Sequence, residues 1–194
     1  MSAAEAKTFE GLLLRFSDDG HDLTLMIEPD DDGDAGALIG PVEEIICRNL
    51  VFADGGGHEF AKNLGAKIRL VAKLAGEHTV LEFYGDWFAS IQGQCSVLAS
   101  AKRDYNLEDL RQKVALLALA YQSIRQFSED ASQREDRLRA RIDQFIEDRR
   151  TRWKARMVFF VDTHPEKATD FQAKLEVLQE LESFLADDQR PAGP

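Results

Sequence analysis

A run of apolar side chains at alternating three- and four-residue spacing begins at Leu107 and constrains the C-terminal half of this chain more than any other feature. The spacing is that of a heptad repeat, which places the repeating residues on one stripe of an α-helix. The repeat continues to Phe145, and a shifted apolar stripe then reaches Phe160. The pattern therefore predicts one long helix over residues 107–160, about 80 Å long at 1.5 Å per residue.

The apolar stripe needs other helices to cover it. A returning helix over residues 165–187, with Pro165 at its start, forms a coiled-coil-like hairpin with the long helix but is too short to reach back beyond about residue 138. We therefore expect a homodimer, with a second copy covering the rest. The alternative is a break near residues 128–132, where the stripe is thin, and a monomeric three-helix bundle. The expected dimer interface consists of Leu110, Val114, Leu117, Tyr121, Ile124, Leu138, Ile142 and Phe145.

The N-terminal half shows the two-residue alternation of β-strands, interrupted by turn residues. Leu12, Leu14 and Phe16 share one predicted strand face, and Ile68 and Leu70 alternate with basic residues in a later strand. Six or seven short strands predict a compact, mostly antiparallel barrel or sandwich. The expected fold class is therefore α+β.

The order of these patterns divides the chain. We expect a flexible N-terminus over residues 1–6, a β-rich domain over 7–103, a helical coiled-coil region over 106–187 and a disordered tail over 188–194. Asn106 is a suitable N-cap for the first helix, because its side chain can accept a hydrogen bond from a backbone N–H of the first turn.

Composition points to a cytoplasmic protein. The chain has no run of 18 uncharged apolar residues and no basic start leading into an apolar segment, so we expect neither a membrane span nor a secretion signal. The two cysteines, Cys47 and Cys95, lie in strand-like segments without metal-ligand spacing, which favours reduced, buried thiols.

The net charge of −11 conceals one basic segment, residues 134–156, with nine basic and five acidic residues. Acid-first pairs four residues apart, such as Glu135 with Arg139, favour a solvated, salt-bridged helix face or a surface for an acidic protein partner. Nucleic acid is the less favoured partner, because the rest of the chain is acidic and repels it. The possible charged binding surface comprises Arg134, Arg137, Arg141, Arg149, Arg150, Arg152, Trp153, Lys154 and Arg156, with Trp153 able to stack on a base.

Sequence motifs for metal binding, phosphate binding or catalysis are weak. The spacing of Asp30, Asp32 and Asp34 resembles the start of a calcium loop, but the glycine and the glutamate that such a loop requires are missing. The glycines 55–57 lack the flanking residues of a phosphate-binding loop. We therefore expect no catalytic residues, metal or cofactor, and a non-enzymatic adaptor or scaffold that self-associates through its helices and presents an acidic β domain to a protein. The alternatives are a nucleic-acid-binding or regulatory protein using residues 134–156, and a small-ligand binder or enzyme using the β domain.

Overall fold

The structure is a computed structural model that describes residues 6–17, 21–27, 42–52, 63–75, 78–85, 88–101, 105–127 and 131–187. The elements in these ranges are β1 (Lys7–Phe16), β2 (Leu23–Ile27), β3 (Val42–Phe52), β4 (Lys67–Ala75), β5 (His78–Gly85), β6 (Phe88–Ala101), α2 (Leu107–Phe127), α3 (Ala131–Phe160) and α4 (Pro165–Asp187). Strands precede helices along the chain, so the predicted α+β class is confirmed.

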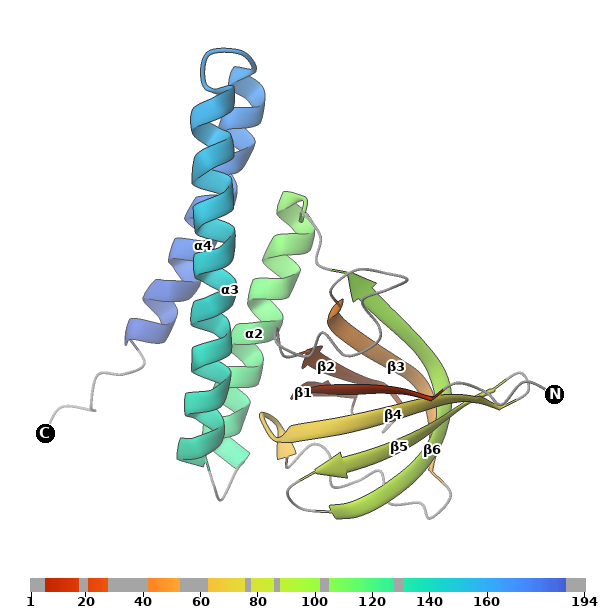
Figure 1. The fold of residues 1–194 in the computed structure, drawn as a ribbon. Coiled ribbons are helices and arrows are strands. Elements are labelled where there is room, and N and C mark those ends of the chain that lie inside the picture. The colour runs from red at the N-terminus through yellow and green to blue at the C-terminus, as the bar shows by residue number, and fades with distance from the viewer. Residues whose placement is uncertain are drawn as a thin grey trace, which may run out of the picture. The chain divides into compact units, whose positions relative to one another are not determined.

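The strands form a closed antiparallel barrel in the order β1-β2-β3-β6-β5-β4 (Figure 1). Strand β1 closes it, because β1 pairs with β2 on one side and with β4 on the other. Gly11, for example, lies opposite Ile27 in β2 and opposite Ile68 in β4. A Cβ at Gly11 would lie 2.5 Å from the carbonyl oxygen of Met26, so the close approach of β1 and β2 requires glycine there.

A β-bulge in β1 changes which residues face the barrel interior. The register against β2 shifts between Leu13 and Arg15, which leaves Leu14 as the extra residue. The bulge resets the alternation, so that Leu13 belongs to the interior cluster and Phe16 packs against it. Leu12 and Leu14 are buried outside that cluster. The prediction that Leu12 and Leu14 share one strand face with Phe16 was therefore wrong.

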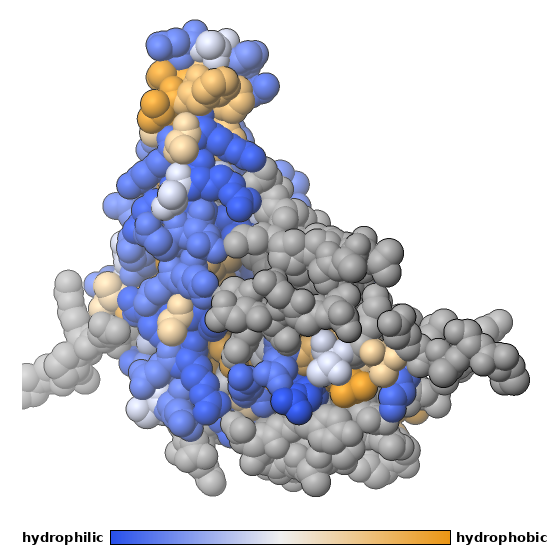
Figure 2. Space-filling view, in the orientation of Figure 1, coloured by the Kyte–Doolittle hydropathy of each residue, from blue (hydrophilic) through white to orange (hydrophobic). Residues whose placement is uncertain are grey.

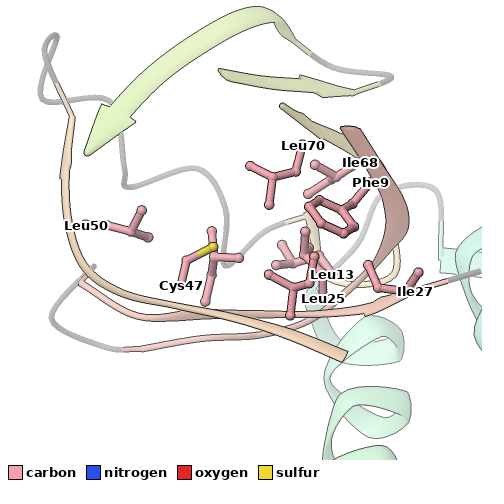
Figure 3. Close-up of a cluster of buried hydrophobic side chains, with 10 residues drawn as sticks. Phe9, Leu13, Leu25, Ile27, Cys47, Leu50, Ile68 and Leu70 are labelled. Carbon is pink, nitrogen blue, oxygen red and sulfur yellow. The ribbon is translucent and has the colours of Figure 1, made fainter. Parts of the chain in front are cut away.

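The described part of the barrel interior is filled by apolar side chains (Figure 3). Cys47 lies among them as a buried free thiol. Large aliphatic side chains from four strands converge there and exclude water, which is the main source of stability for such a core. The cluster consists of Phe9, Leu13, Leu23, Leu25, Ile27, Ile45, Cys47, Leu50, Ile68 and Leu70.

The chain divides into two compact units that interleave along the sequence. The first unit comprises Met1–Arg103 and Ser123–Arg134, and the second comprises Asp104–Gln122 and Glu135–Pro194. The barrel therefore groups with a short helical stretch around the break between α2 and α3, while the remaining helical residues form a unit of their own.

The long helix predicted over residues 107–160 is two helices, so that prediction was wrong. Helix α2 ends at Phe127 and α3 begins at Ala131. The break falls where the heptad stripe is occupied by small or polar residues, so that little apolar area favours a continuous helix. Tyr121 donates a hydrogen bond to Glu135 at 2.7 Å, and the rings of Tyr105 and Phe145 lie 6.1 Å apart. The two helices are therefore antiparallel neighbours.

The side chains expected at a dimer interface are covered within one chain. Val114 is partly buried, and the other seven are 0–4% exposed. A second copy is therefore not needed to cover this stripe, because α3 folds back beside α2, and the predicted dimer interface was wrong. The seven buried residues are Leu110, Leu117, Tyr121, Ile124, Leu138, Ile142 and Phe145.

Several predicted features lie outside the described residues. They are most of the N-terminus, the tail over 188–194, the acidic loop with Asp30, Asp32 and Asp34, and the glycines 55–57. Among the described helices, none is long and apolar enough to cross a membrane.

Candidate functional site

Helices α3 and α4 form an antiparallel hairpin held together along its length (Figure 1). At the end far from the turn, Arg139 donates a hydrogen bond to the carbonyl oxygen of Leu185 at 3.0 Å. In the middle, Arg150 pairs with Glu182 at 2.6 Å. These contacts join residues that are 46 and 32 positions apart in sequence and hold the two helices side by side.

The hairpin turn is closed by backbone hydrogen bonds. The carbonyl oxygen of Phe160 accepts from the N–H groups of Thr163 and His164, at 3.2 and 2.8 Å. Pro165 then begins α4, where its missing N–H costs nothing because the first N–H groups of a helix have no helical partner. The predicted start of the returning helix at Pro165 is therefore confirmed.

Three large apolar side chains at this turn are exposed: Val158, Phe159 and Val161, at 69%, 72% and 53%. We call them the tip patch. Figure 2 shows the apolar atoms gathered at this end of the hairpin, above a mainly hydrophilic surface. Beside the patch lies the tip groove, with a volume of about 410 Å³. The groove is lined by Met157, Val158, Val161, Pro165, Ala168, Thr169 and Gln172.

Aromatic rings support the tip patch from behind. The rings of Phe159 and Phe160 meet edge to face at 5.1 Å, and Phe160 stacks on Phe171 of α4 at 6.2 Å. The Lys167 ammonium lies 5.0 Å from the centre of the Phe160 ring, and the Arg156 guanidinium lies 6.0 Å from that of Phe171. Ring contacts of this kind hold side chains in place, so the Phe159 ring of the patch rests on a fixed aromatic neighbour.

Two members of the predicted charged surface are inside the helical unit. Trp153 is 0% exposed and Arg149 is 1% exposed, so placing them on a binding surface was wrong. The Arg149 guanidinium lies over the rings of Phe145, at 4.9 Å, and Tyr105, at 5.6 Å. The signal was present in the sequence, because Arg149 and Trp153 follow Phe145 at four-residue intervals on the same inward stripe.

Other arginines of the predicted charged surface bind within the chain. Arg134 donates to Asn63 at 3.0 Å, and Arg141 donates to Gln144 at 2.8 Å. Arg137 and Arg156 are partly buried, whereas Arg152 and Lys154 are exposed. The structure therefore does not gather these residues on one exposed basic face.

The expected pairing of Glu135 with Arg139 is replaced by other contacts. Arg139 pairs with Asp143 at 3.0 Å, one turn further along α3, and Glu135 accepts the hydrogen bond from Tyr121. Glu135 therefore binds a residue of another helix, whereas Arg139 pairs within α3 with an acid that follows it in sequence. The sequence had predicted that charges in this segment would be paired within the chain, but with different partners.

The described residues contain no cluster of three or more histidine, cysteine, aspartate or glutamate side chains suited to a metal ion. The pKa of Glu10 in the barrel is held below its ordinary value by a hydrogen bond from Arg69, against the opposing effect of partial burial. That shift reflects an ion pair between β1 and β4.

The sequence did contain a signal for the tip patch. Residues 157–161 read Met-Val-Phe-Phe-Val, five consecutive apolar residues immediately before a turn. Successive residues point about 100° apart around a helix, so one neighbouring helix cannot cover all five. Some of them therefore had to be exposed.

Comparison of the chain with protein-family models, with curated proteins and with solved structures found no match.

Proposed function

We propose that this chain is a non-enzymatic protein-interaction module, an adaptor or scaffold, whose docking surface is the tip patch with its groove. The observation that carries the proposal is the exposure of Val158, Phe159 and Val161 at the end of a hairpin whose visible face in Figure 2 is otherwise mainly hydrophilic. Contiguous apolar surface that a chain does not cover itself is typical of contact sites for other molecules. The proposal keeps the expected class of function but changes the surface. The hairpin turn takes the place of the acidic β domain, which was expected to meet a protein partner, and of the helix stripe, which was expected to mediate self-association.

The size of the patch indicates a weak contact. Fully burying a valine or phenylalanine side chain contributes about 1.5–3 kcal/mol, and the three side chains here are already partly covered. The free energy gained by burying these side chains, a few kcal/mol, must also offset the loss of translational and rotational freedom on binding. The docking surface therefore suits a reversible partner whose own surface adds further contacts.

Two observations make the tip patch a better candidate than the basic helix. Trp153 is buried and has no face for a nucleic-acid base, and Arg149 is covered by aromatic rings. Arg150 is held by Glu182. A nucleic-acid-binding surface would need several such cations presented together toward phosphates.

The proposal is tested by placing a photo-crosslinking amino acid at Phe159 in the full chain and irradiating it in extract of the native host. The matched control carries the same amino acid at Glu180, which is exposed on α4 away from the turn. We expect a discrete set of proteins, or the chain itself, to crosslink from position 159 and not from position 180. Val158→Asp in the position-159 probe should reduce that yield several-fold.

Equal crosslinking from both positions, or no loss with Val158→Asp, would contradict the proposal. Circular dichroism of each variant confirms that the helical content is unchanged.

A further inference from the structure

We propose that the tip patch binds the same patch of a second copy of this chain, with the two α3 helices antiparallel. This inference rests on the proposed function and names its partner. It follows from the charges on either side of the apolar side chains. Lys154 lies four residues before Val158 and Asp162 four residues after it, and all three side chains are exposed.

The spacing of these residues suits a contact with twofold symmetry. Residues four apart lie on the same side of a helix, so Lys154 and Val158 follow one line on α3, and Asp162 lies in the turn two residues after Phe160, where α3 ends. A twofold axis beside Val158 brings each Lys154 toward the turn that carries Asp162 in the other copy, and Val158 opposite itself. Such an isologous contact contains the pair of Lys154 with Asp162 twice and closes as a dimer.

Two more side chains close to Val158 are exposed. They are Ala155, one turn earlier on α3, and Val161, which is 53% exposed and follows the end of the helix. A small side chain such as that of Ala155 lets another helix approach closely. Phe159, beside Val158, adds apolar area to the contact.

The two charges are available for contact with another molecule. Among the residues that the structure describes, neither Lys154 nor Asp162 forms an ion pair. Arg149 and Arg150 of the same helix, in contrast, are buried or paired within the chain. Val158 is therefore flanked by two exposed charges of opposite sign, Lys154 before it and Asp162 after it, and such a pair complements the same pair of a second copy in antiparallel orientation.

The net charge of −11 on each copy opposes association at long range. Salt near 0.15 M screens charges separated by more than about 8 Å and leaves adjacent pairs less affected. The contact is also small compared with the roughly 800 Å² per partner of a standard interface. We therefore expect a weak, reversible dimer that forms in the range of tens to hundreds of micromolar.

The experiment is sedimentation equilibrium of the full chain from about 10 to about 500 µM, concentrations chosen to bracket a small interface. The apparent mass should rise with concentration from 21.8 kDa toward twice that value. Lys154→Glu and Asp162→Lys should each weaken association about tenfold or more, because each creates two like-charge contacts in the dimer. The double variant keeps the net charge of −11 and should return to within about threefold of the original affinity.

Two further variants complete the test. Val158→Asp should abolish association, whereas Glu180→Lys, which makes the same charge change as Asp162→Lys at a distant exposed site, should leave it at least as strong. A strictly monomeric chain, an association that survives Val158→Asp, or a double variant as weak as the single ones would overturn the inference. A monomeric chain that still crosslinks another protein from position 159 rejects self-association and leaves the proposed function standing. A monomeric chain that crosslinks nothing from position 159 rejects both the inference and the proposed function.

Discussion

Gly65 shows how one residue position connects the barrel to a helical segment of the same compact unit. Its φ of +75° lies in the left-handed region that side chains with a Cβ rarely adopt. Its N–H donates to the carbonyl oxygen of Leu13 at 2.7 Å, which extends the pairing of β1 beyond β4. A Cβ at this position would lie 2.6 Å from Cδ1 of Ile124 and 3.2 Å from Cβ of Arg134. Backbone conformation and close packing thus both require glycine.

We expect Gly65→Ala to lower the free energy of unfolding by about 1–3 kcal/mol, from the left-handed backbone and the clash together. The measurement is urea denaturation of the full chain, and the control is a double-mutant cycle with Ile124→Val, which removes Cδ1. Part of the cost should be recovered in the double variant, because only the clash is relieved. A Gly65→Ala chain as stable as the original would contradict this account of the position.

The β1–β4 pair contains an ion-pair cluster whose strength depends on pH. Glu10 accepts a hydrogen bond from Nε of Arg69 at 2.7 Å, and Nζ of Lys67 lies 3.4 Å from its other oxygen. Both basic residues are in β4, and Glu10 lies directly opposite Arg69 in the register. The hydrogen bond from Arg69 is the main reason that the pKa of Glu10 is lowered.

A lowered pKa means that the ionised carboxylate stabilises the folded state above the ordinary pKa, and that this contribution is lost as pH falls through the folded-state value. We expect Glu10→Gln to cost about 0.5 kcal/mol at pH 7, since the pair is partly exposed and screened. The difference should close in acid. Unfolding measured from pH 7 down to pH 3 checks it, with Glu180→Gln as the control, and a difference that grows toward acid would contradict it.

For the helices and strands, the sequence predicted the first residue of an element better than its last residue or the side of a strand that faces the core. The heptad pattern and Asn106 located the start of α2, where the Asn106 side chain accepts from the N–H of Asp109 at 2.8 Å. The break after Phe127 was only an alternative, since a weak stripe is compatible with either arrangement. The bulge at Leu14 was not predicted. A strand is expected to place every second residue on the same face, and a bulge inserts one extra residue that reverses the faces beyond it.

The whole molecule consists of two units whose segments interleave, so no single cut in the chain separates them. Residues 123–134, which group with the barrel, come after the start of α2. A fragment ending at residue 103 therefore lacks Ile124, which lies near Gly65, and Arg134, which binds Asn63.

We expect the fragment of residues 1–103 to be less stable than the barrel within the full chain. Hydrogen exchange of the β1 amides should be several-fold faster in the fragment, because contacts at the adjoining Gly65 turn are missing. The full chain with Arg134→Ala is the control for loss of the Asn63 hydrogen bond alone, and should lie between the two. Exchange rates in the fragment equal to those in the full chain would show that residues 123–134 do not support the barrel.

The candidate site was predictable only in part. Five consecutive apolar residues had to leave some side chains exposed, but exposure of Val158 and Phe159 in particular depends on which side of α3 packs against α4. Burial of Trp153 follows from the same arrangement. Composition and spacing identified the apolar and charged residues, but their distribution between interior and surface is set by how the helices pack.

The closed barrel has a consequence for how this protein can aggregate. Each of the six described strands has a hydrogen-bonded neighbour on both sides, so these strands offer no free edge onto which an extended segment of another molecule could add. Fibre growth by strand addition would first require β1 to separate from β2 or β4. The rate of amyloid formation should therefore depend on the rate at which the barrel opens and not on changes in the helices.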